Sequence, residues 1–111
     1  MTEPAVVFTT TSSTRTITVT ATDAGQITEL RFEAGEYGHG AAALAAEIVR
    51  LAQRCTLLAR ARRREALAAI GLADVLLDRL GLPGPQTVAA ELARLDAPTA
   101  DSIPHRWVRA L

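Results

Sequence analysis

Few residues in this chain of 111 have the types and spacing that catalysis or metal binding requires. His39 lies between Gly38 and Gly40, a pattern that could serve a phosphate group or a metal ion. A metal ion would need a second ligand nearby, and the glycines match neither a Walker motif nor a dinucleotide-binding fingerprint. We therefore predict a plain loop over residues 34–40.

Two aspartates, a second histidine and one cysteine complete the candidates. Asp74 and Asp78 are one helical turn apart, but no third ligand stands at a suitable spacing, so charges on a solvated helix face explain them better. His105 is far from His39 in the sequence, and neither histidine has a recognisable nucleophile or metal partner. Cys55 is the only cysteine and falls among apolar residues, which is typical of a buried core thiol. We predict no catalytic, cofactor-binding or metal-binding residue, and hence no enzyme.

The strongest concentration of charge is a cluster of four arginines: Arg60, Arg62, Arg63 and Arg64. The chain has no lysine, and its 12 arginines balance 12 acidic residues, so a general attraction for nucleic acid is not expected. The cluster is either a solvated helix segment with arginine stems lying on apolar surface, or a contact for phosphates or an acidic partner. We favour the solvated segment.

The longest predicted element is a helix over residues 41–70. Its apolar residues recur at spacings of 4, 3, 4 and 3 and form one seam: Leu44, Ile48, Leu51, Cys55 and Leu58. About thirty residues at ~1.5 Å each span roughly 45 Å, about twice the length of a seven-residue strand. The second half therefore overhangs any sheet that the first half covers, and must break, pack on later segments or meet a second subunit. Arg62 continues the spacing of the seam, which predicts a bend or altered packing near residues 60–64.

Residues 5–33 are predicted to form a three-stranded antiparallel meander. Residues 15–21 alternate between apolar and threonine side chains, which gives one apolar and one polar face. The Asp-Ala-Gly sequence at 23–25 indicates a tight turn. In the third strand, alternation places Leu30 on one face and Ile27 on the other. Such a sheet needs a cover, so the predicted fold class is α+β.

The chain after the long helix is predicted to hold two short helices. Gly71 is placed to end the long helix. A helix over residues 72–80 should bury three apolar residues: Val75, Leu76 and Leu80. Prolines then form a rigid turn, and a third helix covers residues 87–95. Residues 1–96 are thus expected to be a single α+β domain.

The remaining residues, 97–111, form a tail with the only tryptophan, Trp107, between Arg106 and Arg109. One interpretation is a chain terminus whose tryptophan docks loosely on the domain. The other is a short amphipathic anchor for a partner, because tryptophan and arginine are favoured at interfaces. Both interpretations stay open.

The sequence also carries an expectation about location. Its first residues lack the basic region and apolar run of a signal peptide, and no stretch of about eighteen residues is apolar enough for a membrane span. We therefore expect a cytoplasmic protein.

Three groups of segments, covering roughly residues 6–95, also match a known pattern in order. They are residues 16–21 with 25–30, residues 44–48 with 51–52, and residues 80–85 with 89–91. This order resembles the YbaB/EbfC fold, in which a small antiparallel sheet leads into a long helix and pairs of chains dimerise. Within that fold, the chain is most similar to the EspD/EspH-like proteins associated with type VII (ESX) secretion in actinobacteria.

The resemblance implies a non-enzymatic accessory or chaperone-like protein of a type VII secretion system, binding a secretion substrate or a machinery component. It leaves open export by the same system. Together with the overhanging helix it favours a homodimer, whose interface or partner contact is predicted at Leu44, Ile48, Leu51, Cys55, Leu58 and Trp107. The alternative is a YbaB-like nucleoid-associated dimer that binds DNA through Arg60, Arg62, Arg63 and Arg64.

Overall fold

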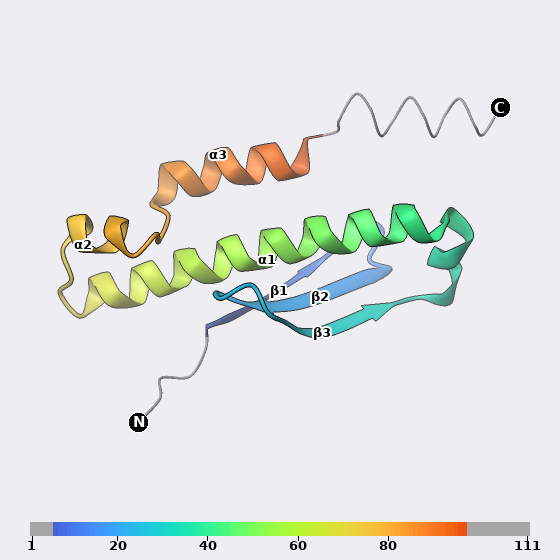
Figure 1. Cartoon of the computed structure of the whole chain (residues 1–111), viewed down its shortest axis with the longest axis horizontal. Helices are drawn as coiled ribbons and strands as arrows, with labels where there is room; N and C mark the ends of the chain where they lie inside the picture. Colours follow the sequence, from blue (N-terminus) through green and yellow to red (C-terminus); the bar gives the residue numbers. More distant parts are fainter. Residues whose placement is uncertain (1–5, 98–111) are drawn as a thin grey trace.

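A computed structural model describes residues 6–97, leaving aside the side chains of Tyr37 and His39. It confirms the α+β class: three antiparallel strands precede one long helix and two shorter ones (Figure 1). The elements are β1 (Val7–Thr11), β2 (Ile17–Thr22), β3 (Ile27–Phe32), a 3-10 helix η1 (Ala34–His39), α1 (Ala41–Ala69), α2 (Asp74–Arg79) and α3 (Pro85–Asp96).

The sheet has the order β1-β2-β3, with β2 in the centre, as the meander predicts. Both connections are stabilised by side-chain hydroxyls that accept hydrogen bonds from the turn backbone. Ser12 Oγ accepts from the amides of Thr16 and Ile17, and Thr22 Oγ1 accepts from two amides of the following turn. Gly25 lies in that turn with a φ of +89°, where a side chain would be strained. The predicted tight turn is therefore confirmed.

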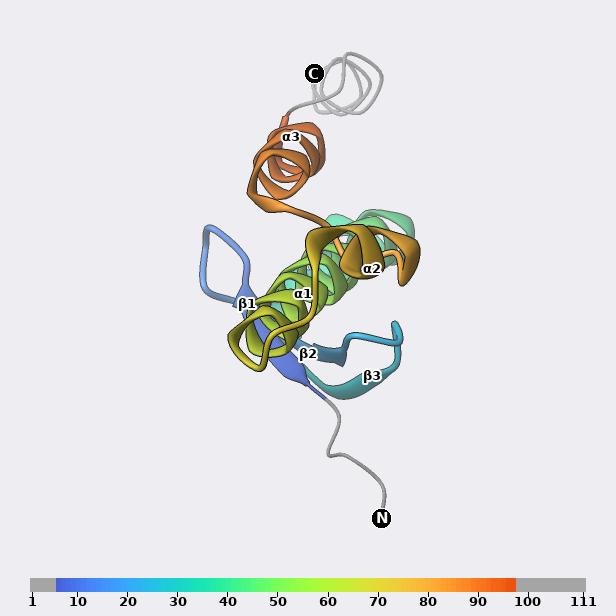
Figure 2. The same cartoon turned by 90° about the vertical axis from the view of Figure 1, so that its left-hand side faces the viewer.

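The core lies between β2 and the leading half of α1. On β2, Ile17, Val19 and Ala21 are at most 2% exposed, as their alternation predicts. On α1, Leu51 and Cys55 of the apolar seam are at most 1% exposed and pack on these strand residues. The helix lies over β1 and β2 (Figure 2). The apolar seam of α1 and the apolar face of the sheet are therefore buried against each other.

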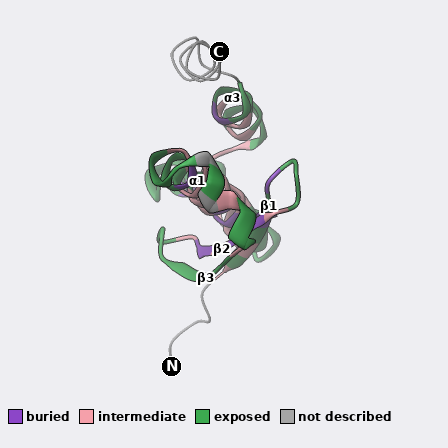
Figure 3. Cartoon of the chain, turned by 90° about the vertical axis from the view of Figure 1, so that its right-hand side faces the viewer, coloured by how far each residue is buried: buried purple, intermediate pink, exposed green. Residues whose placement is uncertain are grey.

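Strand β3 is paired with β2 but extends beyond the cover of α1 (Figure 3). Val19 pairs with Leu30 and Ala21 with Ile27, and the register shifts between Thr20 and Ala21. The extra residue in β3 brings Ile27 onto the same face as Leu30, so the prediction that Ile27 points the other way is wrong. Both side chains remain more than two-fifths exposed, at 43% and 41%.

The two later helices pack on α1: α2 lies near its end, and α3 runs along its middle, from Gly84 near Arg64 to Asp96 beside Arg50. Gly71 follows α1 with a φ of +103°, so the predicted end of the helix is confirmed within a residue. The chain then turns back, and α3 runs beside α1 on the side away from the sheet (Figures 1 and 2). Pro85 opens α3, where the missing amide hydrogen costs nothing. Part of the overhang of α1 thus packs on later segments of the same chain, whereas residues 68–70 at its end stay exposed.

The inward face of α2 differs from the prediction. Val75, Leu76 and Leu80, expected to be buried, are 66%, 53% and 61% exposed, whereas Leu77 is fully buried. A helix of only six residues presents one side chain to α1, and the alternation of apolar residues does not say which one. No helix within residues 6–97 is long and apolar enough to cross a membrane.

Candidate interaction surfaces

Three arginines of the predicted cluster hold the start of the overhang against the sheet. Arg60 Nε donates to the backbone oxygen of Asp23 at 2.9 Å, and Arg63 forms an ion pair with the Asp23 carboxylate. Arg62 stays on the seam, where its guanidinium carbon lies 4.8 Å from the centre of the Phe8 ring. The helix continues unbroken through this region. Altered packing, rather than a break, accommodates the charge on the seam.

The fourth arginine fastens α2 to α1. One guanidinium nitrogen of Arg64 donates to Asp78 Oδ1 at 2.7 Å and to the backbone oxygen of Leu82 at 2.6 Å. The second terminal nitrogen, Nη2, lies 3.6 Å from Asp74 Oδ1. The Arg64 side chain is only 14% exposed, whereas those of Asp74 and Asp78 are 87% and 69% exposed. The two aspartates are therefore largely solvated partners of one arginine, and their spacing serves that ion pair.

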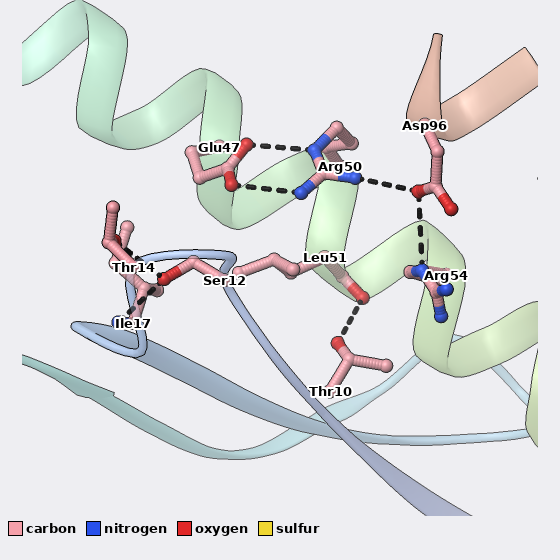
Figure 4. A network of polar contacts seen from close by, with 9 residues as sticks. All are labelled: Thr10, Ser12, Thr14, Ile17, Glu47, Arg50, Leu51, Arg54 and Asp96. Atoms are coloured by element: carbon pink, nitrogen blue, oxygen red, sulfur yellow. Dashed lines mark hydrogen bonds and ion pairs between the residues drawn. The ribbon is translucent and has the colours of Figure 1, made fainter.

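A second charged network, which the sequence did not reveal, fastens α3 to the leading half of α1 (Figure 4). Arg50 donates to Glu47 on its own helix and, at 2.9 Å, to Asp96 Oδ1 at the end of α3. Arg54 donates to the same aspartate oxygen at 3.2 Å. The hydrogen bond with Glu47, and then the charges of both acids, raise the pKa of Arg50. The pairing of Glu47 with Arg50 was readable from their spacing of three, but the contact with Asp96 was not.

Cys55 is a core thiol, as its place on the seam predicts. Its Sγ donates to the backbone oxygen of Val19 at 3.1 Å and lies 3.1 Å from Thr10 Oγ1. Thr10 in turn donates to the backbone oxygen of Leu51 (Figure 4). Among the described residues, no group of three or more His, Cys, Asp or Glu side chains could hold a metal ion. His105 and Trp107 lie outside the described residues.

The seam that was predicted as an interface is mostly occupied within the chain. Leu44, Leu51 and Cys55 are buried against the sheet, so their side chains are not available to a second chain in this fold. Ile48 and Leu58 are partly buried. The cause is that the seam of the leading half packs on β1 and β2 of its own sheet.

The exposed apolar residues that could bind a partner lie elsewhere, at the end of α1 and on α2. Ile70, Val75, Leu76 and Leu80 are 73%, 66%, 53% and 61% exposed. We call these four residues the apolar tip, because the elements that carry them form one end of the molecule (Figure 1). Their exposure at one end of the molecule makes the tip a candidate interaction surface.

A second candidate is a groove of about 540 Å³ along α1, between β3 and α3. Its apolar lining includes Ile27 from β3, Val49 and Leu57 from α1, and Leu95 from α3. Its polar lining includes Gln53, Thr56, Arg60, Glu91 and Arg94. Val49 is 54% exposed, so part of the apolar lining faces solvent.

Comparisons of the chain with protein-family models, with curated proteins and with solved structures gave no match.

Proposed function

We propose that this protein is a non-enzymatic accessory protein that binds another protein through the apolar tip. The observation that carries the proposal is that Ile70, Val75, Leu76 and Leu80 are exposed. Helix α2, which contains two of them, buries only Leu77. Leaving four large apolar side chains in water costs free energy that a partner surface recovers, at about 25 cal/mol for each Å² buried. The tip therefore suits an apolar partner surface, such as one face of an amphipathic helix.

The resemblance of the chain to EspD/EspH-like proteins supports a particular setting for this binding. In that setting the protein is a chaperone-like component of a type VII secretion system, and its partner is a secretion substrate or a part of the machinery. A chaperone-like role fits an apolar binding surface, because a partner awaiting assembly or export must keep its own apolar surface out of water.

The arginine cluster does not make DNA binding the better proposal. Arg60, Arg63 and Arg64 donate to oxygens within the chain, and Arg62 stacks on Phe8. Phosphate binding would have to compete with each of these contacts.

Affinity capture from a native lysate of the source organism tests the proposal. Wild-type protein should retain an identified secretion substrate or machinery component, and Leu76→Asp should lose it. Val7→Asp is the matched control, because Val7 is an aliphatic residue 44% exposed, comparable with Leu76 at 53%, and it lies outside both the tip and the groove. Capture of no secretion component by the wild type, or equal capture by both variants, contradicts the proposal.

A homodimer through the tip is the alternative to a partner protein there, because the same four side chains cannot bind both at once. Two tips related by a two-fold axis would bring α2 against α2 in opposite directions, with Asp74 of one copy near Arg79 of the other. Light scattering at high micromolar concentration should then give twice the mass of one chain for the wild type and the mass of one chain for Leu76→Asp. A single-chain mass for the wild type would exclude the dimer.

A further inference from the structure

We propose that the C-terminal tail of this same chain fills the groove between β3, α1 and α3, with Trp107 as its main anchor. This inference concerns a different surface from the apolar tip and does not depend on the proposed function. It selects one of the two interpretations of the tail that the sequence leaves open.

The groove has the chemistry that a tryptophan side chain needs. Val49, Ile27 and Leu95 supply apolar surface, and two of them, Val49 and Ile27, are 54% and 43% exposed. Gln53, Thr56 and Glu91 supply oxygens that can accept a hydrogen bond from the indole N–H. A buried tryptophan combines these two requirements, since its ring is apolar and its N–H needs an acceptor. At about 540 Å³ the groove has room for an indole and a neighbouring aliphatic side chain.

The tail starts at the edge of the groove. Leu95 lines the groove, and Asp96 next to it is fixed to Arg50 and Arg54. Trp107 is ten positions after Ala97, a distance of ~15 Å as a helix and of up to ~34 Å when extended. The part of α1 that lines the groove, from Val49 to Arg60, is itself only ~17 Å long. Trp107 can therefore reach the whole groove.

The sequence of the tail supplies the matching apolar residues. Two further apolar residues, Ile103 and Leu111, stand four positions before and four positions after Trp107. The apolar tip is a less accessible alternative, because sixteen residues of α1 (~24 Å) separate Arg54, where α3 is fixed, from Ile70. A tethered segment also acts at millimolar effective concentration, which favours it over a free partner for the same groove.

Because Trp107 is the only tryptophan, its fluorescence in the full-length protein reports directly on this contact. In the wild type, emission should lie to the blue of N-acetyltryptophanamide, and the acrylamide quenching constant should be at least twofold lower than that of the free compound. Val49→Asp should shift the emission to the red and raise the quenching constant at least twofold. Ile27→Asp is a second groove variant that should act in the same way.

Leu76→Asp is the control, because it introduces the same charge at a similarly exposed residue outside the groove. Its emission and quenching should equal those of the wild type. Three results would each overturn the proposal: wild-type emission like that of the free compound, no change in either groove variant, or an equal change in the control. A blue shift that appears only as protein concentration rises would also overturn it, because the tail would then occupy a second copy.

Discussion

The two halves of α1 are held in place by different forces. From Leu44 to Ala59 the helix packs apolar side chains against the sheet, and the buried residues there are at most 7% exposed. From Arg60 to Arg64 it is held by guanidinium groups that contact Asp23, Phe8, Asp78 and the backbone of Leu82.

This difference explains why the exposed apolar surface lies where it does. Apolar packing needs a large matched area, so it leaves few apolar side chains of the leading half in water. An arginine holds a helix in place through a few directed hydrogen bonds, and the other side chains of that helix can remain exposed. Helix α2 is held by Arg64 and by the single buried side chain of Leu77, and its other apolar residues remain free to meet a partner.

The largest effect is expected from a charge placed in the leading half. Leu51→Glu puts a carboxylate at a residue that is 1% exposed and has apolar neighbours. Burying it should cost several kcal/mol, on the order of the whole stability of a small domain, so the variant should be unfolded by circular dichroism at 25 °C. Leu76→Glu, at a residue 53% exposed, should have the same free energy of unfolding as the wild type. Equal stability of the two variants would contradict the difference between the two halves of α1.

A smaller loss of stability is expected when the contacts of Arg64 that hold α2 on α1 are removed. Arg64→Gln loses the ion pairs with the solvated Asp74 and Asp78, which contribute roughly 0.2–1 kcal/mol each. It also loses the hydrogen bond to the backbone oxygen of Leu82 from a guanidinium group that is only 14% exposed, and such charge-assisted bonds contribute about 1.5–3 kcal/mol. The loss should be local, so amide hydrogen exchange should accelerate in α2 while remaining unchanged in β2. Arg64→Lys should recover only part of the protection against hydrogen exchange, because lysine keeps the charge but lacks the planar guanidinium group with its several N–H donors. Equal acceleration in both elements would show that the two halves are not held separately.

A still smaller loss of stability is expected from the ion pairs that join the leading half of α1 to the end of α3. Asp96→Asn weakens the contacts with Arg50 and Arg54, whose side chains are 31% and 30% exposed. Such partly exposed pairs contribute roughly 0.2–1 kcal/mol each and are screened by salt. Urea unfolding should show this loss at low ionic strength and a smaller one in 1 M salt, where the Debye length is only about 3 Å. A loss as large as that of Arg64→Gln would contradict the ranking.

The smallest effect concerns the solvent-exposed pair on α3, in which Arg94 is 64% and Glu91 42% exposed. The hydrogen bond from Arg94, followed by its charge, lowers the pKa of Glu91. A lowered pKa in the folded state means that the contribution of the pair is present above the ordinary glutamate pKa and is lost as pH falls through the folded value. Carboxyl NMR titration should show the pKa of Glu91 rising towards its ordinary value in Arg94→Gln. An unchanged titration would show that Arg94 is not the cause.

The sequence by itself determined the order of the strands and α-helices, the apolar seam of α1 and the core position of Cys55. These follow from local rules: helical and strand periodicity select the elements, and Gly71 and Pro85 set helix ends through backbone geometry. The sequence also predicted a plain loop over residues 34–40, and that prediction is wrong because a 3-10 helix forms over Ala34–His39.

Only the tertiary structure decided which charges meet and which apolar residues stay exposed. The partners of Arg63 and Arg50 lie 40 and 46 residues away in the chain, and no local pattern links them. The face of Ile27 was decided by a register shift against β2, and the inward residue of α2 by the way Arg64 and Leu77 seat a six-residue helix. In each case the outcome depends on how separate elements pack together, and periodicity within one element carries no information about that.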